Sequence, residues 1–214
     1  KEGACFGNPC VPNSGAKLEF ATDYLGAGPL PLEIRRTYNS QRFYQPVKVP
    51  AVSTGMGDFW RLSYHRRVVA GVEPTPMAFV IHADGDYRDF KLVGGVWVGR
   101  TDSPERLVEQ KDAGGTRTGW QYIAGNDELS QYDAAGRLTS ITSRSGLTQT
   151  VTYDTNGRLS AVVDPFGRQL SFSYGPDGML GAIADSQGHT YAYAYNANGD
   201  LASVTTDGKQ VPGI

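Results

Sequence analysis

The side chains that most often carry catalysis or hold metals are few and far apart in this sequence. The three histidines, His65, His82 and His189, are not spaced as a pair of metal ligands. The sequence contains no HExxH zinc motif, no GxSxG nucleophile motif and no glycine-rich phosphate loop. Asp84 and Asp86 could contact a cation, although Asp-Gly-Asp is more typical of a hairpin turn. We therefore expect no catalytic residue, no metal site and no cofactor, in a protein that is not an enzyme.

Cys5 and Cys10 are the only cysteines, and Gly7, Asn8 and Pro9 between them favour a bend. We expect a disulfide between the two cysteines, which would indicate an oxidising compartment. Two free thiols, or half of a metal site, are the alternatives. The four residues between the cysteines exceed the usual spacing of a redox or zinc pair, and no histidine is near.

A unit of 21 residues that begins with tyrosine repeats through the C-terminal part of the chain. The units start at Tyr132, Tyr153, Tyr174 and Tyr195. Glycine returns at the fifth position and leucine at the seventh: Gly136 and Leu138, Gly157 and Leu159, Gly178 and Leu180, Gly199 and Leu201. A fixed period of this length is typical of repeat proteins, whose units bury their apolar faces only against neighbouring units.

Two turn signals divide each unit, as the second unit illustrates. Residues 154–157 and 164–167 both begin with aspartate and end with glycine, as in a type I turn followed by a left-handed residue. Between the turns, strand formers alternate with small residues, so Leu170, Phe172 and Tyr174 face one side of a sheet. Each unit therefore predicts two antiparallel strands. Adjacent units must pair edge to edge, because an isolated hairpin is only marginally stable.

Charged residues recur with these turns. The aspartates that begin turns are Asp133, Asp154, Asp164 and Asp185, and the turn already explains their positions. The arginines that follow turn glycines are Arg137, Arg158 and Arg168. We expect these arginines to pair with acids on a neighbouring strand, where an exposed pair would stabilise the fold only slightly.

Tyr191 and Tyr193 alternate with alanine and lead into Tyr195, so the three rings lie on one face of a strand. Such a stripe is usually part of a core. The alternative is an exposed surface that stacks on carbohydrate, which would make Tyr191 and Tyr193 ligand contacts.

The string Tyr-Asp-x-x-Gly-Arg-Leu, complete at residues 132–138 and 153–159, resembles the tyrosine-aspartate (YD) repeat of Rhs proteins. The same type of repeat occurs in the C components of insecticidal toxin complexes and in teneurins. The third and fourth units have drifted, because Gly175 and Asn196 replace the aspartate. The N-terminal region is also similar to the lead-in region of Rhs-type proteins, in a PLPL string that ends in Tyr-Asn-Ser at residues 29–40.

The resemblance implies a structural function. In the family, long arrays of such strands form a hollow shell around a C-terminal toxin or effector, and self-cleavage belongs to a C-terminal segment. We expect this chain to hold neither that segment nor the toxin, and to be a non-catalytic part of a shell. Its partners would be the remainder of the shell, the toxin passenger, or a second copy paired through an edge strand. The alternative is a secreted or surface module that binds glycan or protein through exposed aromatics.

Composition limits the remaining possibilities. The chain has 214 residues and a formal net charge of −2, without the basic excess that nucleic-acid binding requires. No apolar run approaches the ~20 residues that span a membrane. The resemblance and the predicted disulfide favour secretion or display on a bacterial surface.

We predict an all-β fold: an extended, curved antiparallel sheet of stacked β-hairpin YD repeats, continuous with an N-terminal β meander. Residues 1–110 would form the lead-in, residues 111–208 the repeats, and residues 209–214 a tail. Extending the period backwards gives a degenerate unit at residue 111, with Gly115 and Gly125 in the two glycine positions.

Overall fold

The computed structural model describes residues 10–11, 16–40, 54–72 and 76–211. Within these ranges the chain forms strands and turns and no helix, so the predicted all-β class is confirmed. It follows that no helix in this part of the chain could cross a membrane. The predicted disulfide falls outside the described residues, because Cys5 is not among them.

The N-terminal part of the chain forms two four-stranded sheets. The first contains β1 (Cys10–Val11), β2 (Ala16–Leu25), β3 (Glu33–Asn39) and β4 (Trp60–Leu62), in that order. The second contains β5 (Arg67–Val72), β6 (Met77–Ile81), β7 (Tyr87–Val93) and β8 (Val96–Val98), in that order. All neighbouring strands are antiparallel, so each sheet is a simple meander.

The third sheet has eleven antiparallel strands and contains all the repeats. Its first strands are β9 (Arg106–Lys111), β10 (Arg117–Ile123), β11 (Leu129–Asp133), β12 (Leu138–Thr142), β13 (Thr148–Tyr153) and β14 (Leu159–Val163). It continues with β15 (Gln169–Tyr174), β16 (Leu180–Asp185), β17 (Thr190–Tyr195), β18 (Leu201–Thr206) and β19 (Lys209–Val211). Strands pair in sequence order, so each unit adds two strands to the growing edge.

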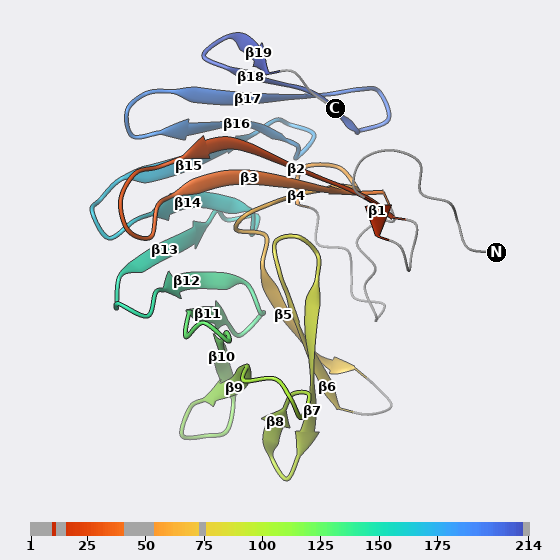
Figure 1. Ribbon diagram of the computed structural model, residues 1–214, viewed down its shortest axis with the longest axis vertical. Coiled ribbons are helices and arrows are strands. Elements are labelled where there is room, and N and C mark those ends of the chain that lie inside the picture. The colour runs from red at the N-terminus through yellow and green to blue at the C-terminus, as the bar shows by residue number, and fades with distance from the viewer. Residues whose placement is uncertain (1–9, 12–15, 41–53, 73–75, 212–214) are drawn as a thin grey trace, which may run out of the picture.

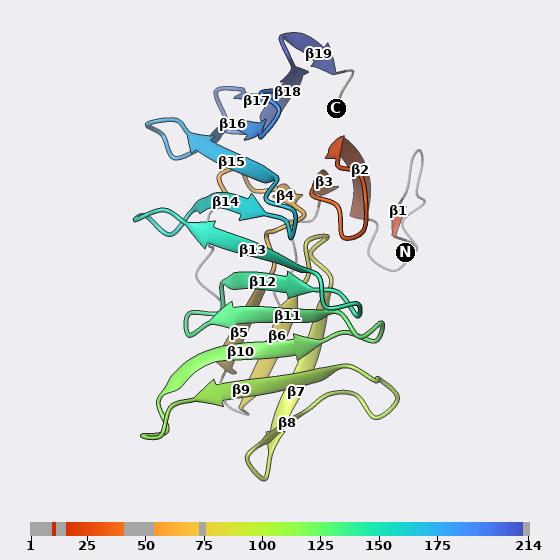
Figure 2. The ribbon, with the colours of Figure 1, turned by 90° about the vertical axis from the view of Figure 1, so that its left-hand side faces the viewer.

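The two smaller sheets lie against one face of the long sheet, which curves around them (Figure 1). In the view turned by 90° the long sheet faces the reader, and the second small sheet lies behind it (Figure 2). The first sheet packs near β17, where the rings of Tyr24 and Tyr191 are 5.8 Å apart. The second packs near β10, where the rings of Trp97 and Trp120 are 5.6 Å apart. The N-terminal strands therefore cover the apolar face that the repeats create.

One hydrophobic core joins all three sheets. Ile34 comes from the first sheet, Phe90 from the second, and Trp120 and Leu170 from the long sheet; each is at most 2% exposed. Ser171 and Ser173, which alternate with the large side chains of β15, are exposed. Burying a large apolar side chain stabilises a fold by about 1.5–3 kcal/mol, so this shared core is the main link between the lead-in and the repeats.

A β-bulge in each unit places two apolar side chains on the core face. Leu138 and Ile141 are both buried although they are three residues apart, a spacing that simple alternation would send to opposite faces. The register pairs Tyr132 with Leu138 and Gln131 with Ser140, which leaves one extra residue on β12. The extra residue reverses the alternation and turns Ile141 toward the core. Alternation within single strands does not reveal this device.

The predicted continuity of lead-in and repeats in one sheet is wrong. The strands are divided among three sheets, and the lead-in meets the repeats face to face. Edge pairing would have left the leucine stripe of the repeats in water, whereas packing two small sheets across it removes that apolar surface from solvent.

The degenerate unit at residue 111 also departs from the predicted phase. Gly115 occupies its turn with φ of 82°, but Asp127, and not Gly125, adopts the left-handed conformation at the second turn, with φ of 65°. The strand β10 (Arg117–Ile123) between these turns contains an irregularity that shifts the phase. At the other end, residues 209–211 of the expected tail add the strand β19.

Candidate functional site

The tyrosine and leucine of each unit face each other across a hairpin. In the unit that starts at Tyr153, this residue pairs with Leu159. The Gly157 amide donates to the Asp154 carbonyl at 2.9 Å, and the Asp154 amide donates to the Arg158 carbonyl at 2.8 Å. Gly157 has φ of 76°, a conformation that glycine adopts without steric cost. The other three units repeat the pairing at the same positions.

The aspartate side chain closes the turn from inside. Asp154 Oδ1 accepts hydrogen bonds from the amides of Asn156 and Arg158, both at 2.9 Å, and Oδ2 accepts from Arg158 Nε at 2.8 Å. The backbone hydrogen bond from Arg158 contributes most to lowering the pKa of Asp154 below its ordinary value. Arg137 binds Asp133 in the same way. The predicted arginine–acid pairs therefore form within one hairpin: Asp133 ends the neighbouring strand β11, and Asp154 lies one residue beyond the end of β13.

Each of these arginines also reaches the tyrosine that begins the next unit. The Arg137 guanidinium lies 5.0 Å from the centre of the Tyr153 ring, and that of Arg158 lies 4.4 Å from the centre of the Tyr174 ring. A cation over an aromatic face is attracted by the ring quadrupole. The arginine of one unit is thus bound to its own aspartate and stacked on the following tyrosine, which explains why the three residue types recur together.

The two drifted units keep the turn with other groups. In the third unit the Gly175 amide donates to the Met179 carbonyl at 2.8 Å, so the backbone turn persists without an aspartate at its start. In the fourth unit Asn196 Oδ1 accepts from the Asp200 amide at 3.0 Å, as the aspartate oxygen does in complete units. The backbone hydrogen bonds are therefore enough to form the turn, and neither the aspartate nor the arginine is required for it.

The second turns of the second and third units, at the opposite strand ends, use the same chemistry with a more enclosed carboxylate. The Asp164 side chain is buried and accepts hydrogen bonds from the amides of Phe166 and Arg168 at 2.9 Å. Burial alone would raise the pKa of Asp164, but hydrogen bonds from the Arg168 side chain and from both amides hold it below its ordinary value. Asp185 and His189 form an equivalent pair, with Oδ2 and Nδ1 2.9 Å apart.

The first turns of the units face the lead-in. The Val68 amide donates to the Gly136 carbonyl at 2.9 Å, and the Leu180 amide donates to the Gly55 carbonyl at 2.7 Å. The Tyr195 hydroxyl donates to the same Gly55 carbonyl at 3.1 Å. A Cβ atom at Gly136 would lie 1.9 Å from the Val68 carbonyl oxygen, a distance no side chain can occupy. Glycine at this position thus serves a close contact between backbones as well as the turn.

Tyr191 and Tyr193 lie in the core, at 5% and 6% exposure. The Tyr193 hydroxyl donates to Asp23 Oδ2 at 3.0 Å, and Arg36 binds the same carboxylate through two hydrogen bonds of 2.7 and 2.9 Å. Tyr191 packs against Tyr24 of β2. The two rings therefore join the repeats to the lead-in, and they are not placed as exposed contacts for a sugar. The spacing of the sequence held no signal for the Asp23–Arg36 pair.

The histidines lie apart and have separate structural roles. His65 Nδ1 accepts a hydrogen bond from the Leu62 amide at 3.0 Å, and burial together with the charge of Arg61 lowers the pKa of His65 to about 3. Burial likewise lowers the pKa of His82. The hydrogen bond that His189 donates to the Asp185 carboxylate raises the pKa of His189. His65 and His82 are therefore neutral at neutral pH, and His65 acts as a hydrogen-bond acceptor.

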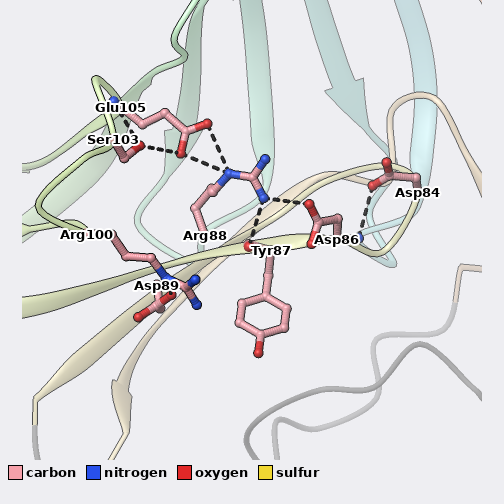
Figure 3. A network of polar contacts seen from close by, with 8 residues as sticks. All are labelled: Asp84, Asp86, Tyr87, Arg88, Asp89, Arg100, Ser103 and Glu105. Carbon is pink, nitrogen blue, oxygen red and sulfur yellow. Dashed lines mark hydrogen bonds and ion pairs between the residues drawn. The ribbon is translucent and has the colours of Figure 1, made fainter. Parts of the chain in front are cut away.

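A polar cluster surrounds Arg88 on β7 (Figure 3). Arg88 Nε donates to Glu105 at 3.0 Å, and Nη1 contacts Asp86 and the Tyr87 carbonyl. Asp84 Oδ1 accepts from the Asp86 amide at 3.0 Å, which closes the hairpin turn. The two aspartates thus hold a turn and an arginine. Within the described ranges no group of three or more histidine, cysteine or acidic side chains is placed to hold a metal.

Comparison with protein families follows the division between lead-in and repeats. The model described as "RHS Repeat" matches residues 132–169 and 153–190, which are consecutive pairs of the tyrosine-led units. Residues 132–190 are therefore RHS repeats. A second model, "Domain of unknown function (DUF6531)", matches residues 7–90, within the predicted lead-in. No curated protein matches the sequence significantly.

Several solved structures align over most of this chain at low similarity. A TcdB2–TccC3–Cdc42 complex aligns over 90% of the chain with 14% identity and a TM-score of 0.34. A Photorhabdus luminescens Tc holotoxin pore aligns over 94% with 13% identity and the same TM-score. The chain spans 11% of the length of each of these solved chains.

Proposed function

We propose that this chain is a non-catalytic wall segment of an Rhs-type shell that encloses or presents a toxin or effector. The observation that carries the proposal is the eleven-stranded sheet, in which every RHS repeat adds two strands in sequence order. Such a sheet can be lengthened without a change of local structure, because each added unit contacts only its neighbours. Its side chains are used in turns, stacking and core packing, which supports a structural role and not a catalytic one.

The size of the sheet supports a role as part of a larger wall. Strands lie about 4.8 Å apart, so eleven strands make a wall about 50 Å wide. A folded passenger of about 100 residues has a radius of gyration of about 13 Å, so its diameter is roughly 35 Å. A wall around it needs a circumference above roughly 110 Å, or about 23 strands. The described sheet would therefore supply about half of one turn.

The lead-in gives this segment a particular place in such a shell. Both small sheets cover one face of the long sheet and share its core, so that face is already filled. A passenger must then lie against later repeats, beyond β19 (Lys209–Val211). We infer that this segment forms a closed end of the shell, and that the complete protein is secreted or displayed on a bacterial surface.

The partners would bind through strand edges. In the described part of the chain, β9 (Arg106–Lys111) and β19 are the end strands of the long sheet, each paired on one side. An unpaired edge accepts another strand through backbone hydrogen bonds. The next repeat of the same polypeptide is the natural partner of β19, and a second copy would substitute when that repeat is absent. Light scattering coupled to size exclusion should then detect concentration-dependent self-association of the isolated chain, and a strictly monomeric species would contradict edge pairing.

Limited proteolysis of the complete natural product of this reading frame tests the shell function. We expect its C-terminal passenger to resist protease as long as the repeats are folded, and to be cleaved once mild denaturant opens the wall. The same passenger produced alone is the control and should be cleaved at once. A passenger that is cleaved equally fast in both contexts would overturn the proposal.

A further inference from the structure

The first turns of the units form a row, and one of them meets a cavity where the others meet backbone. Three of the four turns lie directly against lead-in backbone, in the pairs Gly136–Val68, Gly178–Gly55 and Gly199–Gly57. The turn of Gly157 instead lines a cavity of about 70 Å³ between the long sheet and the segment around β5 (Arg67–Val72). A cavity of this volume holds about two water molecules, or one compact polyatomic ion.

Arginines from both sides line this cavity, and none of the described residues that line it is acidic. The arginines are Arg61, Arg66, Arg67, Arg137 and Arg158. Three of them have a carboxylate partner at 2.7 Å outside the lining, in the pairs Arg66–Glu128, Arg137–Asp133 and Arg158–Asp154. These pairs offset three of the positive charges, and Arg67 is the arginine of the lining that keeps an excess of positive charge at the cavity.

Arg67 also has hydrogen-bond donors that are not satisfied. Its Nε and Nη1 atoms are enclosed by protein and have no hydrogen-bond partner. Its backbone forms an isolated bridge with Arg137, so two cationic residues lie directly opposite each other. Burial lowers the pKa of Arg67. Burial and the charge of Arg67 also lower the pKa of Arg61 to about 10. Buried donors without acceptors are costly, and they are rare unless something else supplies the acceptor.

We propose that this cavity binds one compact oxyanion, a phosphate, sulfate or carboxylate group, through the Arg67 guanidinium. The planar guanidinium fork matches two oxygens of such a group, and an anion would offset the repulsion among the arginines. The bound anion would join the lead-in to the repeats at the one turn of the row where the cavity replaces the backbone contact. The site goes beyond the shell function and does not depend on it.

The test compares the wild-type chain with Arg67→Met and with Arg144→Met at constant ionic strength. Arg144 is 82% exposed and gives the same change of charge away from the cavity. Calorimetric titration with phosphate, sulfate and acetate should give saturable binding to the wild type and to Arg144→Met. Loss of a charge-assisted bond should weaken that binding at least about tenfold in Arg67→Met. Arg67→Lys, which keeps the charge and loses the fork, should fall between them.

Stability measurements provide a second test. The difference in unfolding temperature between Arg67→Met and the wild type should change sign when the anion is added, which a purely structural arginine would not produce. In chloride alone, Arg67→Met should unfold at the same temperature as the wild type or higher, because it removes an unpaired buried charge. In saturating phosphate the order should reverse. Phosphate and sulfate stabilise most proteins without binding, and Arg144→Met measures that general effect. Absence of saturable binding of all three anions to the wild type would overturn the proposal even if a variant fails to fold. Equal affinity in the two folded methionine variants would overturn it as well.

Discussion

The glycine turns of the repeats share one backbone conformation and differ in what lies against them, as the first turn of the first unit and the second turns show. At the first turn, a Cβ atom on Gly136 would collide with the Val68 carbonyl oxygen at 1.9 Å. At the second turn, Gly146, Gly167 and Gly188 have nothing within 4 Å of the equivalent position. All four glycines have φ between 78° and 93°. A repeating glycine therefore reports the backbone conformation of a turn, and it does not report whether another part of the chain is packed against it.

The same contrast separates short-range from long-range polar bonds. Asp154 is held by residues of its own turn, and its carboxylate is about a quarter exposed. Asp23 is held by Arg36 and by Tyr193, which is 170 positions later in the sequence, and its carboxylate is 1% exposed. The turn forms with the hairpin itself, whereas the buried cluster forms only when the lead-in reaches the repeats.

The largest effect should come from removing the buried carboxylate. Asp23→Ala leaves the Arg36 guanidinium enclosed and unpaired, and breaking one partner of a buried ion pair typically costs about 3–5 kcal/mol. Denaturant unfolding followed by tryptophan fluorescence measures the change in free energy. Asp154→Ala is the matched change in a repeat turn and should cost clearly less. Equal losses in the two variants would remove the distinction between long-range and local bonds.

The next effect should separate the two glycine positions. Gly136→Ala combines backbone strain with a collision against Val68, and should cost at least about 3 kcal/mol, in the range reached by few single substitutions. Gly146→Ala meets open space and should cost only about 1–2 kcal/mol, from the left-handed backbone alone. The difference between the two unfolding free energies isolates the contact with the lead-in. If the two variants are equally stable, the close approach of Gly136 to Val68 does not affect the free energy of unfolding.

A smaller effect should appear when the buried aspartate of a second turn loses its charge. Asp164→Asn weakens the bonds from Arg168 and should cost about 1–3 kcal/mol at neutral pH. The pKa of Asp164 is lowered in the folded state. Its contribution is therefore complete above the unfolded pKa of about 3.9 and is lost as pH falls through the lower folded pKa. Stability curves of wild type and variant should converge at acid pH, and a gap that stays constant would rule out the ionised carboxylate as its source.

The smallest effect should come from one cation–π contact between adjacent units. Arg158→Gln removes the guanidinium from the Tyr174 ring, which should cost about 0.5–1 kcal/mol. A double-mutant cycle with Tyr174→Leu measures the coupling between the two residues. Arg144→Gln, an exposed substitution of the same charge, should be close to neutral. Zero coupling in the cycle would show that the recurring arginine serves only its own aspartate.

The parts of the fold that could be predicted from sequence are those built from residues close together in the chain. The hairpin turn depends on its glycine and on the five positions between tyrosine and leucine, so the string itself contains all the partners. The bulge that turns both Leu138 and Ile141 inward could have been detected from their spacing of three residues, which simple alternation does not allow. The stacking of Arg137 on Tyr153 had no such signal, because Tyr195 is kept although the unit before it has Met179 in place of the arginine.

The sequence by itself determined the repeat length, the turns and the face that each strand buries, because these depend on contacts within a few residues and on the alternation of a pleated strand. Only the tertiary structure decided what covers that face. An apolar stripe such as Leu138, Leu159 and Leu180 has the same pattern whether a sheet, a ligand or solvent lies opposite. The hydrophobic effect is non-directional, so it favours covering an apolar surface but does not specify which part of the chain covers it. The partner here is the lead-in, fixed by Asp23, Gly55 and Val68 at contacts that no spacing in the chain could reveal.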